Sequence, residues 1–147
     1  MKKILMVLGG IATVSLVVFY FIYQPTLIRK YEADERKNWE MRDREIERLK
    51  TKISKLMKDI QKYGGDGRCK DHVDCKAVGL GAKTCDGYRT FYHYSSLAMV
   101  DEVEFFSAVR SYNLSDDRIN KLQYKVPSCG AKYLESVCLA GRCGPKP

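Results

Sequence analysis

Polar and apolar residues divide the chain into three blocks. The first contains a stretch without any charged side chain, Ile4 to Tyr23, which follows two lysines and ends just before Gln24-Pro25. Twenty such residues in a helix rise about 30 Å, which is the hydrocarbon thickness of a bilayer. The pattern therefore predicts a single-span transmembrane signal anchor over residues 1–25. A cleaved signal peptide is the alternative, but the apolar run exceeds the ~7–15 residues of such a segment, and no small-residue cleavage site precedes Pro25.

The second block, residues 26–63, is rich in Glu, Lys and Arg and contains neither Gly nor Pro. Gly64-Gly65-Asp66-Gly67 follows it, and glycines at this position are typical of a helix end. The block is therefore predicted to be a long helical stalk, joined by the Gly-rich segment 64–67 to the rest of the chain.

Apolar residues of the stalk recur at the a and d positions of a heptad pattern: Trp39, Ile46, Leu49, Ile53, Leu56, Ile60 and Tyr63. Ile at a with Leu at d favours a parallel two-stranded coiled coil, so one interpretation is a homodimer through the stalk. The same stripe could instead pack on a different protein or on the chain's own C-terminal domain. The pattern leaves these alternatives open.

The third block, residues 68–147, holds turn residues, aromatics and all the cysteines, and is predicted to be a small α+β head. The expected elements are strands around Lys76–Val78 and Tyr88–Tyr94, a helix from Ser95 or Ser96 to about Tyr112, a second helix from Ser115 to Val126, and a hairpin of Ser136–Leu139 with Arg142 onward. The predicted fold class is thus a membrane helix and a long helical stalk, possibly a coiled coil, followed by a disulfide-rich α+β domain.

Cysteine content predicts the chemistry of the head. Three disulfides are expected, and the fifteen pairings that six cysteines allow stay open: Cys69, Cys75, Cys85, Cys129, Cys138 and Cys143. Zinc is less favoured, because only the last two cysteines approach the spacing of structural sites and the chain has only two histidines, His72 and His93. No metal or cofactor is predicted, and the disulfides indicate an oxidising compartment.

The cysteine pattern also resembles a known kind of domain. Cys69-x5-Cys75 with Asp74, the run Gly81 to Gly87, Tyr92-x-Tyr94-Ser95 and Val137-Cys138-x-x-Gly141-x-Cys143 are similar to a small cysteine-patterned domain of uncharacterised bacterial envelope proteins and lipoproteins. The match covers Arg68 to Cys143 and implies no activity. With the predicted anchor, it implies a bacterial inner-membrane protein whose N-terminus is cytoplasmic and whose head lies in the periplasm or outside.

Charge and motifs exclude several function classes. The formal charge is +8, but it is spread along the chain, with twelve basic and eight acidic residues in 24–63 and twelve and ten in 64–147. A nucleic-acid partner would require a concentrated basic face. The chain has no nucleophile-elbow G-x-S-x-G, no phosphate-binding G-x4-G-K-[ST] and no C-x-x-C. We therefore predict a protein that is not an enzyme.

The tyrosine-rich strand gives a candidate interface at Tyr88, Tyr92 and Tyr94, because tyrosine is enriched in protein interfaces. The alternative is that these rings pack over the disulfides. The sequence as a whole predicts a membrane-anchored extracytoplasmic subunit or scaffold that binds other envelope membrane proteins. The alternatives are an anchored inhibitor or immunity-type binder of a secreted enzyme or toxin, and a receptor head for a small molecule or glycan.

Overall fold

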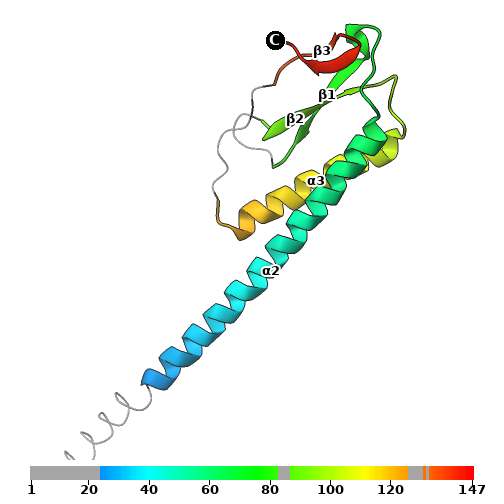
Figure 1. The fold of residues 1–147 in the computed structure, drawn as a ribbon. Helices are drawn as coiled ribbons and strands as arrows, with labels where there is room; N and C mark the ends of the chain where they lie inside the picture. The colour runs from blue at the N-terminus through cyan, green and yellow to red at the C-terminus, as the bar shows by residue number, and fades with distance from the viewer. Residues whose placement is uncertain (1–23, 83–86, 126–130, 132) are drawn as a thin grey trace, which may run out of the picture. The chain divides into compact units, whose positions relative to one another are not determined.

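The computed structural model describes residues 24–82, 87–125, 131 and 133–147. The chain divides into two compact units, Met1–Asp43 and Arg44–Pro147. The described elements run from the long helix α2 (Gln24–Gly64) through β1 (Cys75–Leu80), β2 (Thr90–Ser95) and α3 (Glu102–Leu122) to β3 (Ser136–Leu139) and β4 (Arg142–Pro145) (Figure 1).

The predicted fold class is wrong in its first part. No helix among the described residues is apolar over a length that could cross a bilayer. The predicted span Ile4–Tyr23 lies outside the described residues. The longest described helix, α2, carries charged residues along its whole length, which is the pattern of a helix in water. The described structure consists of two α-helices, the short 3-10 helix η2 (His72–Asp74) and two small sheets.

The stalk is also not separate from the head, because its second half forms part of the head's core. Ile60 is fully buried in a cluster with Leu80, Tyr94, Phe105, Ala108 and Val109, and Ile46 is only 7% exposed. This half of the apolar stripe packs on the chain's own domain, which was one of the three alternatives. In the first unit, Trp39 of the same stripe is 56% exposed. A heptad pattern identifies a buried face and does not identify its partner.

Helix α3 is one continuous helix where the sequence predicted two. Its N-cap is Asp101, whose side chain accepts a hydrogen bond from the Glu104 amide. The expected second start at Ser115 is a helix interior, where the Ser115 hydroxyl donates to the Ser111 carbonyl (2.8 Å). This bond satisfies the hydroxyl without a cap. The polar residues around Ser115 therefore have the pattern of a helix start although they lie inside a helix.

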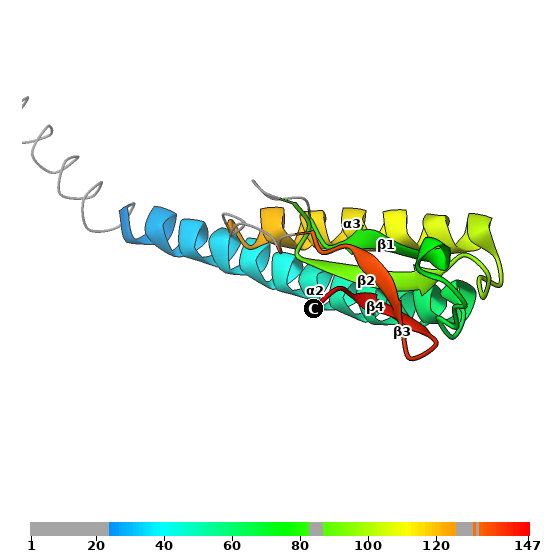
Figure 2. The ribbon, with the colours of Figure 1, turned by 90° about the horizontal axis from the view of Figure 1, so that it is seen from above.

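The two helices run antiparallel within the second unit. At one end the Val100 amide donates to the Tyr63 carbonyl (2.8 Å), and at the other the Arg118 guanidinium donates to Glu45 (3.1 Å). The β1–β2 sheet covers them, with β1 running beside α3 (Figure 2).

The β1–β2 sheet is antiparallel, with register from Cys75↔Ser95 to Leu80↔Thr90. Its even-numbered residues face the helices, and its odd-numbered residues face the β3–β4 hairpin, as alternation along a strand requires. Phe105 of α3 contacts the rings of Tyr92 and Tyr94 on the first face. The hairpin turns at Ala140-Gly141, both with positive φ, and this confirms the predicted hairpin.

Two disulfides join the hairpin to the segment before and at the start of β1. They are Cys69–Cys138 and Cys75–Cys143, so the prediction of disulfides is confirmed for these cysteines. Cys85 and Cys129 lie outside the described residues. These two bonds fasten the β3–β4 hairpin to the β1–β2 sheet.

Candidate functional site

A groove of about 500 Å³ lies between α3 and the edge of β1. Its volume is in the range of ligand pockets in proteins. We call it the α3–β1 groove and define it by Val78, Gly79, Ala82, Tyr88, Phe106, Val109, Arg110, Asn113, Leu114 and Asp117. Most of its lining residues come from α3 and β1, and its apolar side chains include Val78, Phe106, Val109 and Leu114.

Gly79 lets the groove enclose both faces of the β1 edge. Val78 and Leu80 pack toward the helices, so a side chain at position 79 would point to the opposite face. A Cβ built on Gly79 would lie 1.9 Å from Cδ2 of Tyr88, so the tyrosine ring rests directly on the glycine backbone. The groove therefore has α3 as one wall, Tyr88 as the other, and the β1 edge at its base.

The outer edge of β1 carries backbone groups that β2 does not use. The Ser96 amide donates to the Asp74 carbonyl (2.9 Å), which places residue 74 in a hydrogen-bonded pair with β2. Hydrogen bonding alternates along an antiparallel strand, so the backbone groups of Cys75, Ala77 and Gly79 point away from β2. The Gly79 carbonyl confirms this direction, because it accepts from the Asn113 side chain of α3 (3.1 Å).

Polar side chains of α3 hold the loop that ends β1. The side-chain oxygen of Asn113 accepts from the backbone N–H of Gly81 (2.8 Å). Because its side-chain nitrogen donates to the Gly79 carbonyl, this one side chain bonds two backbone groups of the edge. Asp116, only 4% exposed, accepts from the Ala82 amide (2.7 Å) and pairs with Arg89 (3.1 Å). These contacts fix the end of β1 against the helix and set the width of the groove.

Asp116→Ala is expected to destabilise the protein by about 2 kcal/mol, because the buried Ala82 amide loses its acceptor. Asp117→Ala is the matched control. Its carboxylate is 44% exposed and pairs with the exposed Lys121, so its loss is expected to cost less than about 0.5 kcal/mol. Urea unfolding of both variants measures the difference, and equal costs would contradict the role given to Asp116.

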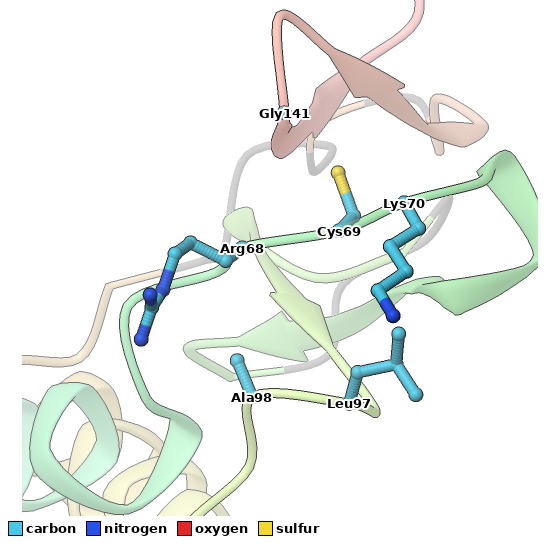
Figure 3. Close-up of a pocket in the computed structure, with 6 residues that line it drawn as sticks. All are labelled: Arg68, Cys69, Lys70, Leu97, Ala98 and Gly141. Carbon is cyan, nitrogen blue, oxygen red and sulfur yellow. The ribbon is translucent and has the colours of Figure 1, made fainter.

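Another hollow, of about 370 Å³, lies beside the Cys69 disulfide and is drawn in Figure 3. Two cations line it, but Figure 3 shows the side chains of Arg68 and Lys70 pointing in different directions. Arg68 is already paired with Asp66 (2.5 Å). Because the two charges do not converge on one point, this hollow is a weaker candidate for a binding site than the α3–β1 groove.

The predicted interface tyrosines are divided between two environments. Tyr88 lines the α3–β1 groove. Tyr92 and Tyr94 instead belong to the core, where they contact Phe105, and burial raises the pKa of both phenols. Six of the predicted stalk-pairing residues lie in the second unit. Ile46 and Ile60 are buried there, and the others are half-buried: Leu49, Ile53, Leu56 and Tyr63.

The described cysteines and histidines have structural contacts. Cys69, Cys75 and Cys143 bring their sulfur atoms within 4.8 Å of one another, but all three are in disulfides and so offer no thiolate to a metal. His72 Nδ1 accepts from the Cys138 amide (3.0 Å). His93 Nδ1 lies 3.0 Å from the Ser136 hydroxyl, and burial lowers the pKa of His93.

Sequence reasoning did not identify the polar side of α3. Asn113, Asp116 and Asn120 follow one another at helical spacing, and all three bond the β1 loop, Arg89 or the residues after the helix. This spacing was the available signal, since it places three polar residues on one face of a helix. The sequence instead predicts a helix start here, because Ser115, Asp116 and Asp117 are residues typical of a first helical turn.

No protein-family profile, curated protein or solved structure matches this chain significantly. The resemblance to a cysteine-patterned envelope domain therefore rests on the residue spacing and stays a prediction.

Proposed function

We propose that residues 44–147 form a protein-binding module that works in an oxidising, extracytoplasmic compartment and binds its partner in the α3–β1 groove. The two described disulfides support the compartment, because such bonds persist where thiols are not kept reduced. The bacterial envelope setting is part of this proposal and rests on the cysteine pattern.

The observation that carries the proposal is a row of exposed apolar side chains on α3 beside the groove. Phe106, 40% exposed, and Leu114, 62% exposed, line the groove, and Val103, 77% exposed, lies on the same side of the helix one turn before Phe106. Single exposed apolar residues are ordinary, but a row of them bordering an apolar groove is typical of an interaction surface. A partner that covers these side chains would remove apolar surface from water, which favours binding.

The charges of the groove favour binding over catalysis. Within the described residues, the ionisable side chains other than Tyr88 that line it are Arg110 and Asp117, and Asp117 is held by Lys121 (2.7 Å). General acid–base chemistry requires a positioned group with a free proton-transfer role, and this arrangement supplies none. The groove is suited to holding an apolar segment in place.

Site-specific photocrosslinking of the full chain in its own cells tests this function. A photoreactive amino acid at Phe106 or Leu114 is expected to give a discrete protein adduct, because both positions face the bound partner. Glu104 is the matched control, since it is exposed and lies on the side of α3 away from the groove lining. Adducts of equal yield from all three positions, or from none, would overturn the proposal.

A further inference from the structure

We propose that an extended segment of the partner protein binds along the outer edge of β1 as a third strand of the sheet, an inference that rests on the proposed function of the α3–β1 groove. Strand addition supplies affinity through main-chain hydrogen bonds and specificity through pockets for alternate side chains. The structure provides both elements at this edge.

The width of the sheet explains why a position is vacant. Packed helices lie 8–10 Å apart, and neighbouring strands lie ~4.8 Å apart, so two strands cover less than two antiparallel helices. The described β1–β2 sheet has only these two strands, and β1 runs beside α3 (Figure 2). A strand added outside β1 would lie over Phe106 and Leu114, the exposed apolar residues of α3 that line the groove.

The backbone of β1 offers the hydrogen-bonding groups. Ala77 presents its N–H and C=O away from β2, and no described hydrogen bond outside the β1–β2 pairing uses them. Asn113 occupies only the Gly79 end of the edge. A hollow of about 440 Å³ borders Cys75 to Ala77, and the groove borders Val78 and Gly79, so open space follows the strand over these residues.

The two walls define the chemistry of the occupant. Successive side chains of a strand point to opposite faces, so one would enter between Phe106 and Val109, and the next would lie beside Tyr88. Arg110 is exposed at the rim and has no ion pair within the described residues. The segment should therefore alternate apolar residues and carry one carboxylate opposite Arg110, which a guanidinium binds well.

A second copy of this chain does not fit the same position. Its own β1 is covered by α3 on one face and by Tyr88 at Gly79 on the other, so it is too thick to enter between these same walls. A single uncovered segment is the occupant that the groove can accept.

The probe is a display library of random linear peptides, selected on the full chain, followed by titration of the synthetic peptides. Selected sequences are expected to alternate apolar residues and to contain Asp or Glu. Phe106→Ala and Arg110→Glu should each weaken binding about tenfold, through lost apolar contact and lost charge pairing. Glu104→Gln is the matched control, because Glu104 is exposed on the side of α3 away from the groove, and it should bind as the unchanged chain does.

Ala77→Pro separates strand addition from other binding in the groove. Proline removes the outward N–H and leaves the β1–β2 bonds in place, because edge positions of this kind tolerate proline. A loss of about tenfold or more is expected from the missing main-chain bonds. If Phe106→Ala weakens binding and Ala77→Pro does not, the binding function stands and strand addition is overturned. If neither variant weakens binding, or no peptide is selected, both are overturned.

Amide hydrogen exchange keeps the test decisive if Ala77→Pro does not fold. In the unchanged chain, the Ala77 amide should exchange quickly when free and slowly when the selected peptide is bound. Unaltered exchange at Ala77 in the complex would overturn strand addition. Protection that rises with protein concentration in the absence of peptide would also overturn it, since the occupant would then be a second copy.

Discussion

Ile60→Ala is expected to lower the free energy of unfolding by about 3–4 kcal/mol, which is within the range for deleting a fully buried aliphatic side chain. Ile60 has no exposed surface and belongs to a core cluster with Leu80 and Phe105. This cluster draws residues from β1, β2 and α3, so the deletion affects the packing of all three elements. The residue comes from the helix that sequence alone assigned to a separate stalk. The measurement is urea unfolding of the full chain, followed by the near-ultraviolet circular dichroism of the buried tyrosines.

Trp39→Ala is the matched control, because Trp39 occupies the same heptad position as Ile60. It is 56% exposed in the first unit and stacks with the Arg42 guanidinium 3.5 Å from its ring centre. Its loss is expected to change stability by less than about 0.5 kcal/mol, as for most surface substitutions. If both variants lost similar stability, and the loss depended on protein concentration, the stripe would be pairing two chains and the intrachain core would be the wrong explanation.

The sequence predicted those elements whose signals are local. Gly64-Gly65 ends α2 where the stalk was predicted to end, because Gly65 adopts a positive φ. The strand predicted around Tyr88–Tyr94 forms as β2, where Tyr92 and Tyr94 pack in the core and His93 faces the hairpin. The partner of each face was not predictable, since it depends on contacts between residues far apart in the chain. Tyr92 and Tyr94 are thus predicted in an interface, whereas in the structure both rings contact Phe105, which is 0% exposed.

The groove could not be predicted from the sequence for the same reason. Its walls are residues of β1, the following loop and α3, which the Gly79–Tyr88 contact and the bonds of Asn113 and Asp116 bring together. Tyr88 was proposed for an interface on composition alone, and the structure places it in the candidate site. The sequence places Val103 and Phe106 in one predicted helix and Leu114 between two predicted helices, so it does not group the three residues. Their exposure results from the narrow sheet, which no local pattern encodes.

Removal of both described disulfides is expected to cost about 7 kcal/mol, which is more than the sum of the two single removals. Each bond alone closes a loop with a sequence separation of 69 or 68 residues, worth about 4.4 kcal/mol in the chain-entropy description. When one bond is present, the other closes only the short path from Cys69 to Cys75 and from Cys138 to Cys143. That smaller loop of about a dozen residues is worth about 3 kcal/mol.

The test uses three variants in which cysteines are replaced by alanine in bonded pairs, so that no unpaired thiol is created at these positions. Removing Cys69 with Cys138, or Cys75 with Cys143, should each cost about 3 kcal/mol, and the combined variant should exceed their sum by about 1.5 kcal/mol. Strict additivity in urea unfolding would show that the two bonds constrain different parts of the unfolded chain. A loss of about 7 kcal/mol is comparable to the whole stability of a domain of this size. Such a unit would fold only after both bonds form, which would restrict partner binding to the oxidising compartment.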